Sequence, residues 1–161
     1  MSYKEISAIE ISDTHDECAE VHKILSCEIA ATETYREVIS VLEGSSETWK
    51  LEQLMHDHED AVLYWKSQIR SPQLHLSQSS SAWSKVIKAI LSKTKIEKVT
   101  HAIDKLKDAE LSETNNYKNL LNNSSITASQ KSYIKTILLP AHESHLKRLE
   151  RMSSHALELT R

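Results

Sequence analysis

The chain has 161 residues, enough for one domain, and its single glycine, two prolines and lack of phenylalanine favour long helices over a β-sandwich. Its 20 basic and 23 acidic residues give a net charge of −3, so no nucleic acid and no membrane surface is expected as a partner. The N-terminus carries charges where a signal peptide needs an apolar run, and we therefore expect a cytoplasmic protein.

The first half of the chain predicts a helical hairpin that follows residues 1–13, which form an N-terminal arm or a short helix. A capping box at Thr14–Glu17 predicts the start of a helix over residues 14–43, and Gly44 supplies a C-terminal stop. After a short turn, apolar residues at three- and four-residue spacing predict a second helix over residues 46–70.

The second half predicts another hairpin after a serine-rich crossover at residues 71–94, which contains a short amphipathic helix at 82–91. A capping box at Thr94–Glu97 begins the predicted third long helix, over residues 95–122. A third box, Thr127–Gln130, begins the predicted fourth helix over residues 127–153, with a tail at 154–161. Pro140 lies inside this fourth helix and predicts a kink or a local defect there.

The lengths of these connections predict how the helices are arranged. Tight turns make each pair an antiparallel hairpin, whereas the crossover is long enough to span the length of a bundle. The chain is therefore expected to form a single all-α domain over residues 1–161, a four-helix bundle of two antiparallel hairpins. Trp83 on the short crossover helix is expected to anchor that helix to the bundle.

A repeated motif carries the functional prediction. Glu28 is followed by Thr32 and Tyr35, and Glu110, 82 residues later, is followed by a threonine and a tyrosine at the same spacings. Seven residues make about two helical turns, so each acid shares the apolar face of its helix with a tyrosine. An ionised carboxylate on such a face is costly unless it is paired, hydrogen-bonded or bound to a metal. The tyrosine hydroxyls are expected to reach the buried acids.

With these motifs the chain resembles the ferritin-like superfamily. The stretch from Glu28 to Tyr35 is similar to the first-helix acid-x6-Tyr motif of bacterioferritin-type proteins, and the stretch from Glu110 to Tyr117 to its third-helix counterpart. Asp57 and Asp60 fall where the Glu-x-x-His of the second helix is expected. The crossover helix with its tryptophan further resembles an uncharacterised group of bacterial ferritin-like bundles. The resemblance implies a bundle-core metal site with six candidate ligands: Glu28, Asp57, Asp60, Glu110, His142 and His145.

The second helix offers two kinds of candidate ligand for this site, aspartates and histidines. His142 and His145 lie 85 residues after Asp57 and Asp60, close to the spacing of the glutamates, but both histidines then come from the fourth helix. Aspartate is also one methylene shorter than glutamate. His58 lies at the centre of the second helix's apolar stripe and is a rival ligand, with His56 a weaker one. The resemblance implies a symmetric centre that holds two metal ions. A site for a single metal ion, or a remodelled site, is therefore an alternative to it.

Two functional hypotheses follow. The first is a ferritin-like protein that binds a divalent metal; if the metal is iron, the resemblance implies iron oxidation or peroxide handling. The second is a metal-free structural or partner-binding bundle, in which a Glu-His-Tyr network satisfies the interior. A homodimer is compatible with either hypothesis. The absence of a Cys-x-x-Cys motif excludes a rubredoxin module within this chain, and no catalytic residue is assigned.

Overall fold

The computed structural model describes residues 4–69, 82–91 and 95–158, with side chains over 19–69, 82–91 and 97–155. Every regular element in these ranges is a helix, as predicted for an all-α protein, and they contain no strand. The parts of the predicted crossover at 71–81 and 92–94, including Thr94 of its capping box, lie outside the described residues, as do residues 159–161 of the predicted tail.

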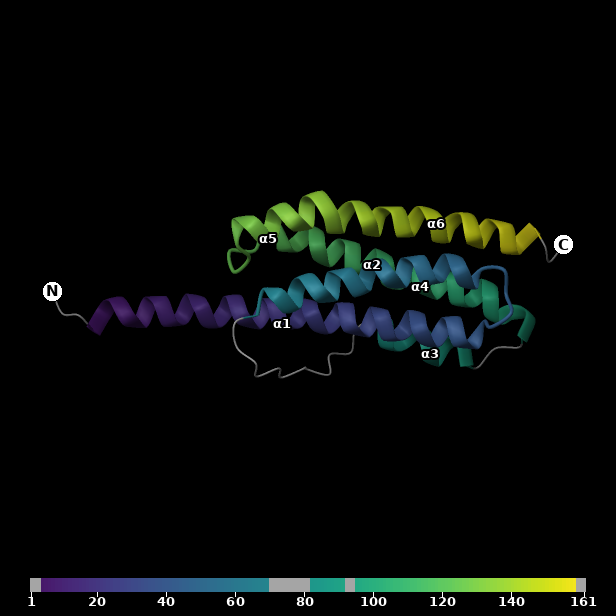
Figure 1. Cartoon of the computed structure of the whole chain (residues 1–161), viewed down its shortest axis with the longest axis horizontal. Helices are drawn as coiled ribbons and strands as arrows, with labels where there is room; N and C mark the ends of the chain where they lie inside the picture. Colours follow the sequence, from purple (N-terminus) through teal and green to yellow (C-terminus); the bar gives the residue numbers. More distant parts are fainter. Residues whose placement is uncertain (1–3, 70–81, 92–94, 159–161) are drawn as a thin grey trace.

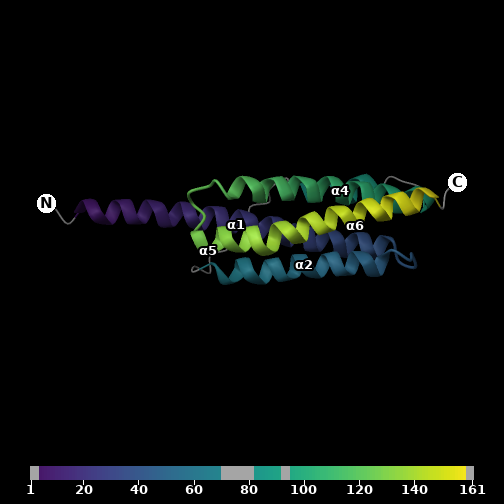
Figure 2. The same ribbon diagram turned by 90° about the horizontal axis from the view of Figure 1, so that it is seen from above.

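The first hairpin consists of α1 (Lys4–Val41) and α2 (Thr48–Ser67), which pack against each other in opposite directions (Figure 1). The predicted helix start at Thr14, with a separate arm or short helix before it, was wrong, because α1 begins at Lys4 and continues through Thr14 without a break. Residues 4–13 contain neither glycine nor proline, so nothing local stops the helix, and a capping box is only a local signal. This N-terminal part of α1 projects beyond the end of the bundle (Figures 1 and 2).

The turn between α1 and α2 depends on Gly44. Its backbone has φ +84°, the left-handed region that glycine enters without steric cost. The Leu42 backbone N–H still donates to the Val38 carbonyl, and the Ser45 N–H donates to the Leu42 carbonyl across the turn. The predicted stop at Gly44 is therefore confirmed.

The crossover brings α3 (Ala82–Leu91) against both α1 and α4 (Lys95–Leu120). Trp83 is only 1% exposed, and its ring centroid lies 5.8 Å from that of Tyr35. The Thr34 hydroxyl lies 3.4 Å from the Trp83 carbonyl, to which it donates. Trp83 thus anchors α3 to the bundle, as predicted.

The second hairpin pairs α4 with a long interrupted helix made of α5 (Ala128–Tyr133), a π-helical turn η1 (Ile134–Leu138) and α6 (Leu139–Glu158). The predicted capping box at Thr127 and Gln130 is present with both of its hydrogen bonds. Following the colours in Figures 1 and 2, α1 and α6 run in one direction along the bundle, and α2 and α4 run in the other.

The π-turn is the local defect predicted at Pro140. Proline has no N–H to donate, and just before it the Leu139 N–H donates to the Ile134 carbonyl, five residues back. One extra residue in a turn rotates everything that follows by about 100° around the helix axis. His142 and His145 come directly after this turn, so it sets the direction in which both point.

The core consists of two apolar clusters separated along the bundle axis. The larger includes Tyr35, Trp83 and Ile103, and the smaller includes Leu25, Trp65 and Tyr117. Buried polar residues occupy the level between the clusters, where water has little access. The fold therefore places a polar layer inside an apolar bundle.

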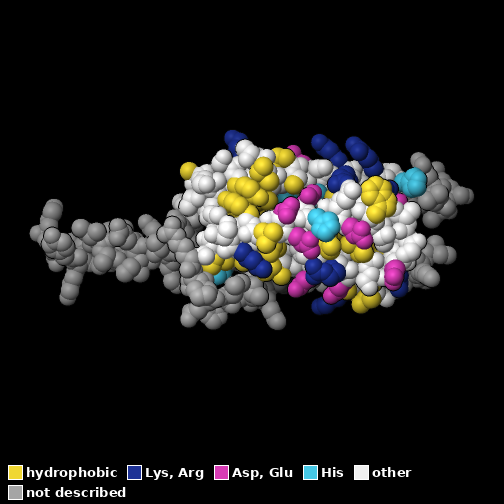
Figure 3. Space-filling model, in the orientation of Figure 1, with side chains coloured by type: hydrophobic (Ala, Val, Ile, Leu, Met, Phe, Trp, Pro, Cys, Tyr) yellow, Lys and Arg dark blue, Asp and Glu magenta, His cyan; other side chains and the backbone are white. Residues whose placement is uncertain are grey.

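The surface in Figure 3 carries basic and acidic side chains intermixed, with hydrophobic side chains gathered mainly over one half of the bundle. Within the described part of the chain, none of the helices has both the length and the apolar character needed to cross a bilayer.

Replacing Gly44 with alanine should destabilise the protein by about 1 kcal/mol, because an L-residue is forced into the left-handed region. A Cβ at this position would meet no atom within 4 Å, so the cost is confined to the backbone. The free energy of unfolding from urea titration measures the change, with Glu43→Ala at the adjacent exposed position as the control. Equal stability of the two variants would contradict the assigned role of Gly44.

Candidate metal centre

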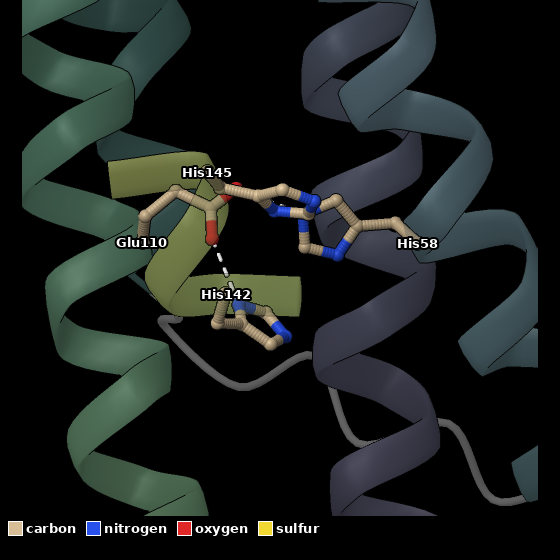
Figure 4. Close-up of side chains that lie close together, drawn as sticks. All are labelled: His58, Glu110, His142 and His145. Atoms are coloured by element: carbon tan, nitrogen blue, oxygen red, sulfur yellow. Dashed lines mark hydrogen bonds and ion pairs between the residues drawn. The ribbon is translucent and has the colours of Figure 1, made fainter. Parts of the chain in front are cut away.

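Four buried side chains converge in the polar layer. His58 comes from α2, Glu110 from α4, and His142 and His145 from α6, and none is more than 2% exposed (Figure 4). Each offers one ligand atom, and the four atoms lie within 4.8 Å of one another. The three imidazole ring centroids form a triangle with sides of 5.2, 5.3 and 5.5 Å.

The repeated motif positions the acids through local hydrogen bonds. The Thr32 hydroxyl donates to the Glu28 carbonyl at 3.0 Å, and the Thr114 hydroxyl donates to the Glu110 carbonyl at 2.7 Å. Each threonine thus satisfies its own hydroxyl within its helix. The carboxylates are left to face the other helices.

Each tyrosine of the repeated motif donates a hydrogen bond to the acid of the other hairpin. The Tyr35 hydroxyl donates to Glu110 at 2.6 Å, and the Tyr117 hydroxyl donates to Glu28. The Trp65 indole N–H donates to the Tyr117 hydroxyl at 3.0 Å. The predicted contact of tyrosine hydroxyls with buried acids is confirmed, with each tyrosine serving the acid of the other half of the chain.

His58 joins the two glutamates. Its Nδ1 lies 2.7 Å from a Glu28 oxygen and its Nε2 lies 3.0 Å from a Glu110 oxygen. Both ring nitrogens face acceptors, so the protonated imidazolium satisfies both carboxylates at once.

The histidines of α6 complete the layer. His142 Nδ1 lies 2.8 Å from Glu110, and its Nε2 lies 3.6 Å from Glu28. His145 Nδ1 lies 3.1 Å from Glu110, and its Nε2 lies 2.9 Å from Asp57. Glu110 is therefore the acceptor shared by all three imidazoles.

Charge compensation within the layer shifts the pKa values of its groups. Burial alone would lower the pKa of His58, but Glu110 and Glu28 outweigh it and raise that pKa to about 9. Burial would raise the pKa of Glu28, but His58 and His142 lower it to about 2. In the same way the pKa of Glu110 is held well below its usual value, and that of His142 well above. Without a metal ion, imidazolium protons supply the positive charge that the carboxylates need.

The predicted ligands divide into three groups. Glu28, Glu110, His142 and His145 meet in the layer. Asp57 reaches it only through His145, and its side chain is 47% exposed. Asp60 is exposed on the surface of α2, outside the cluster of ligand atoms.

The imidazole supplied by α2 is His58, the rival named from the sequence. It lies seven residues from both Leu51 and Trp65, so all three share one buried stripe. Asp57 and Asp60 flank this stripe. The position of His58 within this apolar stripe was the signal that identified the α2 ligand. The 85-residue spacing to His142 and His145 pointed to Asp57 and Asp60 instead.

Sequence reasoning missed Glu113, which is 5% exposed and lies one helical turn beyond Glu110. Burial and the negative charge of Glu28 raise the pKa of Glu113 to about 7. The available signal was its three-residue spacing from Glu110, which places both acids on the same side of α4.

Comparisons of the chain with protein-family models, with curated proteins and with solved structures find no match. Its function is therefore inferred from its own residues and their geometry.

In the metal-free protein the ion pair of the polar layer should stabilise the fold most between about pH 4.5 and 6.5, while the raised pKa of Glu113 lowers stability as the pH rises from 4.5 through about 7. The raised pKa of His58 contributes stability that is complete below its ordinary value of 6.5 and is lost as the pH rises through about 9. The lowered pKa of Glu28 contributes stability that is complete above 4.5 and is lost as the pH falls through about 2. The two shifts describe one ion pair and are not summed.

The alkaline loss should be on the order of 3 kcal/mol, given about 1.4 kcal/mol for each pKa unit. Urea titrations in EDTA at several pH values between 5.5 and 9.5 measure it. His56→Gln, which changes an exposed histidine on the same helix, should leave the profile unchanged. Stability that stays flat or rises over this range would contradict the charge assignment.

Proposed function

We propose that the protein is a ferritin-like bundle that binds one divalent transition-metal ion in its core. The ligands would be His58, Glu110, His142 and His145, with Glu28 beside them. The observation that carries the proposal is the convergence of four buried ligand atoms within 4.8 Å.

The residues present fit a metal ion. Metal–nitrogen and metal–oxygen bonds are about 2.0–2.2 Å long, so ligand atoms around one ion lie no more than about 4.2 Å apart. Tetrahedral ligand atoms at these bond lengths lie about 3.4 Å apart, so the cluster, whose ligand atoms lie within 4.8 Å of one another, needs to contract by roughly 1 Å around an ion. Three imidazoles and a carboxylate suit zinc, iron, cobalt or nickel better than magnesium or calcium.

Charge favours one metal ion over two. The described cluster contains two fully buried carboxylates, Glu28 and Glu110, whose combined charge balances one divalent cation. A second ion would need about two more negative charges, and the further acids beside the layer are Glu113, whose raised pKa disfavours its ionised form, and the half-exposed Asp57. The ferritin-like pattern expected from the sequence has four carboxylates, so the proposed site is a remodelled form of that pattern.

Outer contacts of the kind that tune metal sites surround the proposed ligands. Tyr35 donates to Glu110, and Asp57 contacts the outward nitrogen of His145. Such partners fix the orientation of ligands and typically change affinity by about 10- to 100-fold when removed. The arrangement of two antiparallel hairpins joined by a crossover also supports the ferritin-like assignment. If the ion is iron, it would supply oxidation of Fe(II) or the handling of peroxide.

A second candidate function is a metal-free structural bundle, and a specific observation favours it. Every carboxylate oxygen of Glu28 and Glu110 already has a hydrogen-bonding partner in the described structure. A satisfied buried network of this kind can fix the register of helices without a ligand.

Replacing His58 with glutamine should weaken the binding of Co²⁺ at least about 100-fold, because loss of an outer partner alone typically costs about 10- to 100-fold. Isothermal titration of the EDTA-treated full chain measures the affinity and stoichiometry. His56→Gln is the matched control, since it alters an exposed histidine two residues away. One Co²⁺ per chain is expected for the wild type and the control, and equal affinity of all three proteins would contradict the proposal.

Adding Co²⁺ at 100 times its dissociation constant should stabilise the wild type by roughly 2.7 kcal/mol, because the ion binds only the folded state. Glu110→Gln should gain no such stabilisation, since it removes the carboxylate that contacts all three imidazoles. Urea titrations with and without Co²⁺ measure both effects. If Co²⁺ stabilises neither protein and Glu110→Gln is markedly less stable than the wild type in EDTA, the structural function is supported instead.

A further inference from the structure

A cleft of about 240 Å³ lies between α1 and α4, beside the polar layer. Cys27, on its α1 wall, directly precedes Glu28, and Glu113, on its α4 wall, follows Glu110 by one turn. Because α1 and α4 run in opposite directions, these two segments face each other on the same side of the site (Figures 1 and 2). A water molecule takes up about 30 Å³ of liquid, so the cleft has room for several waters or a hydrated ion.

Glu113 is the buried acid of this cleft. Its side chain lines the cleft although the residue is only 5% exposed, and among the described residues it has no hydrogen-bond or ion-pair partner. A carboxylate in such surroundings is costly when ionised, which is why its pKa rises to about 7. A cation would relieve this cost by pairing with the acid.

The remaining polar groups of the cleft suit a cation that is held weakly. Glu20 on α1, Asn116 and Asn119 on α4 and Asn123 in the turn after α4 add oxygen atoms of the kind that divalent cations accept as ligands. Lys23 opposes tight binding by its positive charge. Burial and the charge of Glu113 raise the pKa of Cys27 to about 12, so its thiol stays protonated and is a poor metal ligand.

We propose that this cleft is the route by which a divalent transition-metal ion reaches and leaves the buried cluster, with Glu113 as the carboxylate that receives the ion before Glu28 does. The inference rests on the proposed metal-binding function. The rival route runs along α2 and α6, where the partly exposed Asp57 contacts His145.

The experiment follows Co²⁺ binding to the EDTA-treated full chain by stopped-flow absorbance and its release on mixing with excess EDTA. An ion that enters and leaves by one route crosses the same barrier in both directions. Glu113→Gln should therefore slow association and dissociation of Co²⁺ together, while the dissociation constant stays nearly unchanged. We expect each rate constant to fall on the order of tenfold, the lower end of the effect of charged clefts on association.

Three variants make the test specific. Asp108→Asn removes a carboxylate from the exposed side of α4, outside the cleft, and should bind and release Co²⁺ at wild-type rates. Asn116→Trp narrows the exposed rim with Glu113 intact and should slow both rates, which keeps the test valid if Glu113→Gln fails to fold. Asp57→Asn tests the rival route.

The outcomes distinguish failure of the proposed entry route from failure of the proposed metal site. Unchanged rates in both Glu113→Gln and Asn116→Trp overturn the inference, as does slowing by Asp57→Asn alone. Faster dissociation with unchanged association in Glu113→Gln would make this acid a ligand of the cluster, and would also overturn the route. A wild type that binds no Co²⁺ refutes the proposed function itself, whereas wild-type binding with normal rates in the cleft variants refutes only the route.

Discussion

The burial of two carboxylates between two apolar clusters is the constraint on which the rest of this structure depends. An ionised acid in such a place must be neutralised by its neighbours. Glu110 receives Tyr35 and all three histidines of the layer, and His58 extends the contact to Glu28. The contacts of these two acids therefore decide how α1, α2, α4 and α6 are turned about their own axes.

The sequence predicted the features that depend on local spacing. The repeat from Glu28 to Tyr35 and from Glu110 to Tyr117 lies within single helices, so two helical turns suffice to place each acid and tyrosine on one face. The capping box at Thr127 and the stop at Gly44 are equally local, and the structure contains both. That the helices form one all-α assembly likewise follows from composition and periodicity.

Other features depend on how the helices pack against one another, and they could not be predicted from the sequence or were missed. Neighbouring positions on a helix point about 100° apart, so choosing between Asp57 and His58 required the rotation of α2 against the other helices. The start of α1 was missed because a capping box can occur inside a longer helix. Glu113 was missed because its burial depends on how α1 and α4 lie together. Pro140 indicated a defect, but its form as a π-turn and its effect on His142 and His145 required the structure.

The hydrogen bonds that each tyrosine makes to the acid of the other hairpin have a consequence for how the two hairpins separate. Separating the hairpins would break both tyrosine–carboxylate bonds and the His58–Glu110 contact, and would leave two buried phenols without an acceptor. Each acid would keep imidazole partners of its own hairpin, His58 for Glu28 and His142 and His145 for Glu110. The tyrosines are therefore the groups that lose their partners when the two halves of the bundle part.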